Sequence, residues 1–287
     1  MLPTSLKRIL ATSISVMCAV SFTACGTAGS SGSTKSSASD TSNVLRVGTD
    51  PTVGLPYSSK TADQQDFRGI DVDLLRAVGK KLGKKVTVTS ISFDALIPAI
   101  QSGRVDATAA SMFDTKKRQK VVDFIDYYRT ASGMIIAANA SFVPDSIDDL
   151  CGHKVGAMRG AAEEAAAEEQ SKKCTDAGKK ALEIKQLPSW KDVSLAVKSG
   201  QIEVGLGDPG VWEYMQGQQP DVFKSVGKVF SPAYIGIAVA KDSKLTPQIK
   251  NALQELIDDG TYSKILAKYN LGNSQGKIST VTVNNGI

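Results

Sequence analysis

Residues 96–110, LIPAIQSGRVDATAA, and residues 194–208, SLAVKSGQIEVGLGD, share one organisation. Each is expected to form a helix that ends at Ser-Gly and is followed at once by a short strand. Because this unit occurs twice within an alternation of strand-like and helix-like segments, we expect an α/β protein with two similar lobes and largely parallel sheets. The carboxyl ends of the strands would then face one another across a cleft, which is where open α/β sheets bind ligands.

The same alternation assigns the other segments from Val44 onward. We expect further strands at 44–50, 85–91, 133–139, 153–160, 181–187 and 232–241. We expect further helices at 69–83, 161–173 and 190–200, a short helical turn at 115–124, and two amphipathic helices within 245–272.

The N-terminal residues have the pattern of an export signal. Lys7 and Arg8 precede ILATSISVMCAVSF, an apolar run of signal-peptide length that is too short to span a membrane. The run ends in FTAC, which resembles a bacterial lipobox, so residues 1–24 are expected to be removed and Cys25 to carry lipid, including palmitate. Phe22 is bulky for that motif, and a plain secretory signal stays open. Residues 25–43 are rich in Gly, Ser and Thr and are expected to form a flexible tether.

Composition and charge favour an ordinary globular protein. Hydrophobic residues make up 41% of the chain and charged residues 22%. The net charge of +5 falls to +3 without residues 1–24, because Lys7 and Arg8 leave and no acid does. The basic residues stand in short runs at expected helix ends without interleaved aromatic residues, so we expect no nucleic-acid partner. No motif calls for a cofactor.

Cysteine usage supports a disulfide. If Cys18 leaves with the signal and Cys25 is lipidated, Cys151 and Cys174 remain, and two thiols in an exported protein are expected to pair. Two free buried thiols or a metal site are the alternatives. His153 is the only histidine, so a Cys/His metal site would lack ligands.

A series of segments carries a family resemblance. LRVGTDPT, GIDVDLL, FDALIPAIQSGRVDA, TKKRQKVVDFIDYY, DDLCGHKVGAMRGA, KSGQIEVGLGD, YIGIAVAKDS and LIDDGTYSKILAKY occur in this order. Together they resemble the extracellular solute-binding proteins of bacterial amino-acid ABC importers, the polar amino-acid group (family 3), over about 44–272.

The resemblance implies a periplasmic-binding-protein-like fold in which two lobes, joined by two hinge strands, close over one small solute and dock on a membrane permease. It places lobe 1 at 44–131 and 233–272, lobe 2 at 132–232 and a C-terminal tail at 273–287. It implies a monomeric receptor, not an enzyme, held outside the cytoplasm by its N-terminal lipid.

The resemblance also assigns the two ends of the ligand. Arg118 stands where the family binds the ligand's α-carboxylate, and Asp208 where it accepts from the α-ammonium. A planar guanidinium matches a carboxylate fork, and charge-assisted hydrogen bonds are strong in a closed cleft. The residues alone leave two other interpretations open, a solvated Arg118 on a basic helix and a turn role for Asp208.

Four more positions follow from the same match. Phe93 would pack on the ligand side chain or belong to the core, and Ser111 would contribute a hydroxyl or backbone contact. Asp50 stands where relatives that bind cationic amino acids place an acid, although a turn or cap before Pro51 is the alternative. Gly160 precedes a helix whose free N–H groups can meet a carboxylate.

The chain also departs from the family pattern. Phe113 and Ala162 replace hydroxyl residues of the carboxylate site, and the aromatic lid is displaced from Val53 to Tyr57. The ligand is therefore expected to be an unusual amino acid, a derivative, or a solute other than an α-amino acid. Trp190 would line the cleft or act as a structural cap.

Other function classes remain as alternatives. An enzyme on the same scaffold, such as a dehydratase, needs an acid or base, and Glu163 and Glu164 are the candidates, although both are expected on a helix surface. A sensory ligand-binding domain is the third possibility, but no signalling segment or membrane span follows residue 272.

Overall fold

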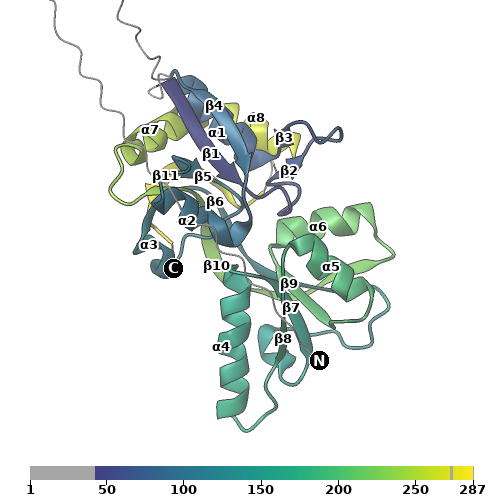
Figure 1. Cartoon of the computed structure of the whole chain (residues 1–287). Helices are drawn as coiled ribbons and strands as arrows, with labels where there is room; N and C mark the ends of the chain where they lie inside the picture. Colours follow the sequence, from purple (N-terminus) through teal and green to yellow (C-terminus); the bar gives the residue numbers. More distant parts are fainter. Residues whose placement is uncertain (1–42, 272–273, 287) are drawn as a thin grey trace, which may run out of the picture. The chain divides into compact units, whose positions relative to one another are not determined.

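The computed structural model describes residues 43–271 and 274–286 (Figure 1). The expected signal peptide, Cys25 and nearly all of the expected tether lie outside these residues. No helix in the described part of the chain is long and apolar enough to cross a membrane.

The strands mostly follow the predicted alternation. They are β1 (Val44–Thr49), β2 (Ser59–Lys60), β3 (Phe67–Arg68), β4 (Lys85–Ser90), β5 (Ala107–Thr108), β6 (Val122–Ala137), β7 (Lys154–Met158), β8 (Glu183–Leu187), β9 (Val204–Gly207), β10 (Phe223–Ala240) and β11 (Lys277–Val283).

The helices connect these strands and cover the sheet. They are α1 (Ile70–Lys81), α2 (Leu96–Gln101), α3 (Lys116–Gln119), α4 (Ala162–Asp176), α5 (Trp190–Lys198), α6 (Pro209–Gln218), α7 (Leu245–Asp258) and α8 (Thr261–Lys268), with short 3₁₀ helices η2 (Phe93–Ala95) and η3 (Ile147–Leu150).

One continuous sheet carries both lobes, in the order β4-β1-β5-β10-β6-β9-β7-β8. We call lobe 1 the part built on β4, β1, β5 and the adjoining halves of β6 and β10, and lobe 2 the part built on β9, β7, β8 and the other halves. Neighbours among β1, β4 and β5, and among β7, β8 and β9, are parallel. The sheet is mixed rather than largely parallel, because β6 and β10 run antiparallel to each other through both lobes (Figure 1).

The segments that differ from the sequence expectation include α3, α6 and β11. The helical turn expected at 115–124 is shortened to the four residues of α3, and the chain is already a strand at Val122. The reason is burial: seven consecutive residues from Val122 are buried, as the central strand of a sheet requires. Helix α6 was not expected, and residues 277–283 form β11, paired with β6.

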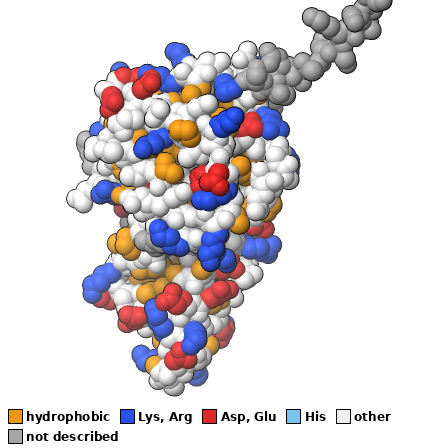
Figure 2. All heavy atoms as spheres, turned by 90° about the vertical axis from the view of Figure 1, so that its left-hand side faces the viewer, with side chains coloured by type: hydrophobic (Ala, Val, Ile, Leu, Met, Phe, Trp, Pro, Cys, Tyr) orange, Lys and Arg blue, Asp and Glu red, His pale blue; other side chains and the backbone are white. Residues whose placement is uncertain are grey.

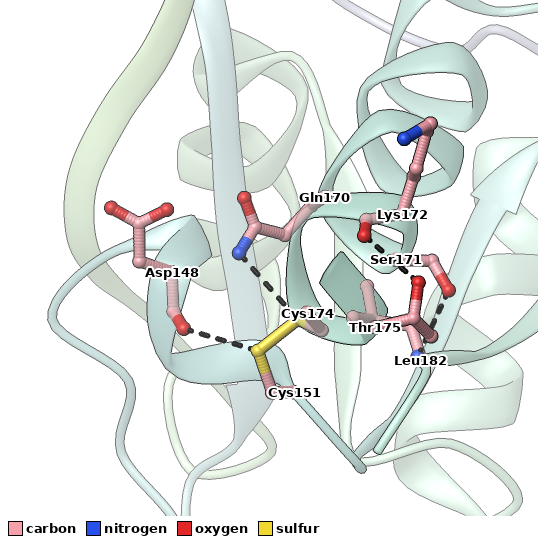
Figure 3. Close-up of a disulfide and its surroundings, with 8 residues drawn as sticks. All are labelled: Asp148, Cys151, Gln170, Ser171, Lys172, Cys174, Thr175 and Leu182. Carbon is pink, nitrogen blue, oxygen red and sulfur yellow. Dashed lines mark hydrogen bonds between the residues drawn. A yellow bond between two sulfur atoms is a disulfide. The ribbon is translucent and has the colours of Figure 1, made fainter. Parts of the chain in front are cut away.

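The predicted disulfide is present. Cys151 follows η3 and Cys174 lies in the last turns of α4, with their Cα atoms 5.6 Å apart. Figure 3 shows the bridge, with the Gln170 side-chain amide donating to the Cys174 sulfur at 3.7 Å. Closing a loop of this length stabilises the fold by about 3 kcal/mol, mainly through the unfolded chain.

Candidate ligand-binding site

The candidate residues gather where strands end. Asp50 directly follows β1, Asp208 follows β9, and Gly160 stands two residues after β7. Arg118 reaches the same region from α3, which precedes the hinge strand β6. Residues from both lobes therefore meet at the carboxyl ends of parallel strands, as the sequence predicted.

Arg118 connects the two lobes. Its Nη1 donates to the Phe113 carbonyl at 2.7 Å and its Nη2 to the Gly160 carbonyl of lobe 2 at 2.8 Å. The guanidinium carbon lies 5.5 Å from the centre of the Phe93 ring. Desolvation lowers the pKa of Arg118 to about 10, so it stays charged at neutral pH. This half-buried cation is not the solvated surface charge that composition alone favoured.

Asp208 is fully buried and has the local role that was the alternative, while its contact with a ligand stays a prediction. Its Oδ1 caps α6 by accepting from the Gly210 N–H at 2.8 Å, and also accepts from the Tyr57 hydroxyl of lobe 1 at 3.1 Å. Its Oδ2 accepts from the Thr130 hydroxyl at 2.7 Å. Burial raises the pKa of Asp208 to about 6 despite these donors.

Ser111 offers a free hydroxyl. Its N–H donates to Asp71 Oδ2 at 2.8 Å, while its buried Oγ has no hydrogen-bond partner among the described residues. An unpaired buried hydroxyl is unfavourable, and an acceptor on a ligand would satisfy it. Asp71 also accepts from the Tyr127 hydroxyl, and burial raises the pKa of Asp71 to about 6.

Asp50 is engaged within lobe 1. Its Oδ2 accepts from the Phe93 N–H at 2.8 Å, and its Oδ1 accepts from the N–H and hydroxyl of Thr52 at 2.8 and 2.7 Å. The structure thus gives Asp50 the capping role that was the alternative, while Phe93 is buried beside Arg118. Contacts of Asp50 and Phe93 with a ligand stay predictions.

The structure shows where the residues that depart from the family pattern lie. Val53 is buried in the core, and Tyr57, four positions later, supplies the hydroxyl that reaches Asp208. Phe113 is buried and pairs with Ile235 of β10, and its backbone carbonyl holds Arg118. Ala162 is the first residue of α4.

Gly160 and Trp190 also have defined places. Gly160 has a φ of 75°, a conformation that glycine adopts without strain. The Trp190 ring is buried, and its centroid lies 6.3 Å from the centroid of the Trp212 ring. This is the position of a structural cap in lobe 2. Ligand contacts of both residues stay predictions.

Glu163 is the residue whose environment the sequence analysis got wrong. It was expected on a helix surface, but its exposed fraction is 1%. Its Oε1 accepts from the Ser132 hydroxyl at 3.1 Å. Burial, followed by the charge of Asp208, raises the pKa of Glu163 to about 7, while Arg118 acts in the opposite direction. Glu164 is half-buried, and its Oε2 accepts from the Gly160 N–H at 2.5 Å.

The site therefore carries an excess of negative charge. Asp71, Glu163 and Asp208 are buried, and the charge of Asp208 raises the pKa of both other acids. Arg118 is the cation whose charge acts on Glu163. A cavity of about 600 Å³ lies between residues 51–68 of lobe 1 and 189–215 of lobe 2, and neither these three acids nor Arg118 lines it.

In the described ranges, no three His, Cys, Asp or Glu side chains are placed to hold a metal ion. Binding of a ligand carboxylate by Arg118 and of an ammonium by Asp208 stays a prediction.

Comparisons with known proteins show the family of the chain. Residues 45–272 match the family of bacterial extracellular solute-binding proteins, family 3. The lysine/arginine/ornithine-binding periplasmic protein of Escherichia coli (strain K12) is 32% identical over 233 residues, covering 78% of this chain and 86% of the relative.

Two solved structures extend the comparison. An ancestral arginine-binding protein bound to arginine is 35% identical, with a TM-score of 0.73 over 79% of this chain and 98% of the other. An ancestral amino acid-binding protein, a precursor of cyclohexadienyl dehydratase, is 29% identical, with a TM-score of 0.71 over 79% and 96%. With the family match spanning most of its length, the chain belongs to the bacterial extracellular solute-binding proteins of family 3.

Proposed function

We propose that this protein is the solute receptor of an ABC importer and that its solute is a basic amino acid. The excess of buried acid over cation in the site carries this proposal. A zwitterion leaves the net charge of the site unchanged, whereas a ligand with an additional cation neutralises one of the acids that repel one another. The relatives point the same way, since one binds lysine, arginine and ornithine and another was solved with arginine.

The two ends of the solute have partners from different lobes. Arg118 of lobe 1 would bind the α-carboxylate, together with the Ser111 hydroxyl that lacks a partner. Asp208 of lobe 2 would accept from the α-ammonium, and Glu163 would face the side-chain cation. Since a solute gains both sets of contacts only when the lobes are together, binding favours the closed state by that differential affinity.

Delivery follows from the same closure. The closed receptor would dock on the membrane permease as a monomer. Cys25 would hold it at the outer face of the membrane through its lipid, which mass spectrometry of the mature N-terminus can test.

A binding panel tests the proposed solute class. Thermal shift and calorimetry would compare arginine, lysine, ornithine and histidine with glutamine and glutamate at pH 7.5. We expect the basic amino acids to stabilise the protein and glutamate to have no effect. Tighter binding of neutral or acidic amino acids would contradict the proposal.

A pair of substitutions tests the carboxylate anchor. Arg118→Ala removes two charge-assisted hydrogen bonds and is expected to weaken binding at least 100-fold, at about 1.5–3 kcal/mol per bond. Lys117→Ala is the matched control, since Lys117 is an exposed cation on the same short helix. Equal affinity of both variants would exclude Arg118 as the anchor.

A second candidate function is an elimination of the dehydratase type. One observation favours it: Glu163 is buried in the site with a pKa raised to about 7, a value suited to a general acid at neutral pH. The related ancestor of a cyclohexadienyl dehydratase is itself an amino acid-binding protein. Consumption of a bound solute by purified protein, followed by NMR and lost in Glu163→Gln, would favour the enzyme over the receptor.

A further inference from the structure

The C-terminal residues continue along lobe 1 beyond the last helix. Strand β11 pairs with β6, with Val283 opposite Ile125 (Figure 1). Next, the Asn284 side-chain carbonyl accepts from the Phe124 N–H at 2.9 Å, and its amide donates to Asp123 Oδ1 at 2.9 Å. Residues 282–286 are thus fixed to the strand that follows α3.

The end of this segment contacts the loop before α3. The Gly286 N–H donates to Asp114 Oδ2 at 2.7 Å. A Cβ at Gly286 would overlap the backbone carbonyl of Asp114, so the two backbones approach more closely than any other residue allows. The contact therefore depends on glycine at this position.

Asp114 in turn adjoins the Arg118 anchor. Its Oδ1 accepts from the Gln119 side chain at 2.8 Å, and Gln119 is the neighbour of Arg118 in α3. The residue before Asp114 is Phe113, whose carbonyl accepts from Arg118 Nη1 at 2.7 Å. The charge of Asp114 also favours the charged form of Arg118 and so opposes the lowering of its pKa by burial.

A second acid makes this loop dependent on the C-terminal segment. Asp126 of β6 is buried beside Asp114, and burial together with the charge of Asp114 raises the pKa of Asp126 to about 7. Its Oδ2 accepts from the Thr282 hydroxyl at 2.9 Å and from the Asn285 N–H at 3.3 Å. These donors offset the repulsion between two neighbouring carboxyl groups.

We propose that residues 282–286 position Arg118 for its solute by fixing the loop at Asp114. They would act on Arg118 indirectly, through Asp114 and Phe113, without contacting the solute. The segment is then a positioning element of the carboxylate anchor rather than a passive tail.

The test is the hydrogen-bonded state of the Arg118 side chain. In protein with ¹⁵N-labelled arginine, the Arg118 guanidinium signals are assigned by their loss in Arg118→Lys. Because two carbonyls hold the Nη groups, we expect separate, slowly exchanging Nη signals in the unsubstituted protein. Gly286→Ala, which must displace the segment from Asp114, should merge or shift them.

Gln254→Ala is the matched control. Gln254 of α7 holds the middle of β11, accepting from the Val281 N–H at 2.9 Å and donating to the Ser279 carbonyl at 3.2 Å. This variant should lower stability while leaving the Arg118 signals unchanged. Should Gly286→Ala fail to fold, a chain ending at Val283 keeps β11 and removes the Asp114 contact.

Binding of L-arginine gives the second readout. We expect about tenfold weaker binding in Gly286→Ala and unchanged binding in Gln254→Ala. Arg118 signals and affinity unchanged in Gly286→Ala, or changed equally in Gln254→Ala, would overturn the proposal. Should L-arginine not bind the unsubstituted protein, the proposed solute class fails, while the Arg118 signals still decide whether the segment positions this side chain.

Discussion

Replacing Glu163 by Gln should stabilise the protein at alkaline pH and leave it nearly unchanged under acidic conditions. Glu163 is buried on α4 and bonded to Ser132. Glutamine has a similar shape, can keep the contact to the Ser132 hydroxyl, and carries no charge. The substitution therefore isolates the cost of an ionised carboxylate in this position.

The magnitude follows from the pKa of Glu163, which burial raises from its ordinary 4.5 to about 7. That difference corresponds to about 3 kcal/mol. Between these two values the folded protein holds a proton that the unfolded chain has released, so stability falls as pH rises. The contribution is complete below about pH 4.5 and lost above about pH 8. The advantage of Glu163→Gln should grow by about 3 kcal/mol over this range.

Urea unfolding at pH 5 and pH 8, without added solute, measures this difference. Trp190 and Trp212 are the only tryptophans in the chain, and both are buried in lobe 2, the lobe of Glu163. Their fluorescence therefore reports the unfolding of lobe 2, which contains the substituted Glu163. Asp71, Asp126 and Asp208 are present in both proteins, so their own titration largely cancels in the comparison.

Glu168→Gln serves as the control, because Glu168 is exposed on the same helix. It should change stability by less than about 0.5 kcal/mol at either pH. A stability gain in Glu163→Gln that is the same at pH 5 and pH 8 would refute the reasoning, since it would not arise from ionisation.

Two further predictions concern the disulfide and proton release. Replacing Cys151 and Cys174 together by Ser should lower the free energy of unfolding by about 3 kcal/mol while solute affinity is retained, and mass spectrometry of the non-reduced protein should find the two cysteine peptides joined. Free thiols there would disprove the bridge. Binding of a basic amino acid at pH 6.5 should release protons, because the cation lowers the pKa of Asp208 and Glu163, both raised by burial. Calorimetry in phosphate and in Bis-Tris should therefore give different heats, and equal heats would contradict the linkage.

The architecture could be predicted from the sequence because the same helix-strand unit occurs once in each lobe. The repeated helix-Ser-Gly-strand unit became α2 with β5 and α5 with β9, and Arg118 of lobe 1 is in contact with Gly160 of lobe 2. Helix α6 was missed although its signals were present: Asp208 caps it and Pro209 occupies its first turn. Two internal glycines and a weak apolar stripe concealed it.

The burial of Glu163 could not be predicted from the sequence, and the reason is physical. The segment AAEEAAAEE has no distinct apolar face, so nothing in it shows which of Glu163 and Glu164 points inward. The decision comes from Ser132 of β6, which lies 31 residues earlier in the chain and donates to Glu163. The paired residues of β11 and β6 also lie far apart in the chain, and no local sequence pattern indicates that they pair.

The hydrogen bonds at the two ends of the site explain why a charged solute would be preferred. Arg118 is held by two neutral carbonyls, and Asp208 accepts from the neutral hydroxyls of Tyr57 and Thr130. A carboxylate competing for Arg118 and an ammonium competing for Asp208 would each add the attraction between opposite charges to a hydrogen bond that now has only one ionised member. A neutral solute would gain nothing by this exchange. Affinity then depends on how much more strongly Arg118 and Asp208 bind the charged groups of the solute than the neutral groups that hold them now. A second cation on the solute, placed near Glu163, would increase this gain.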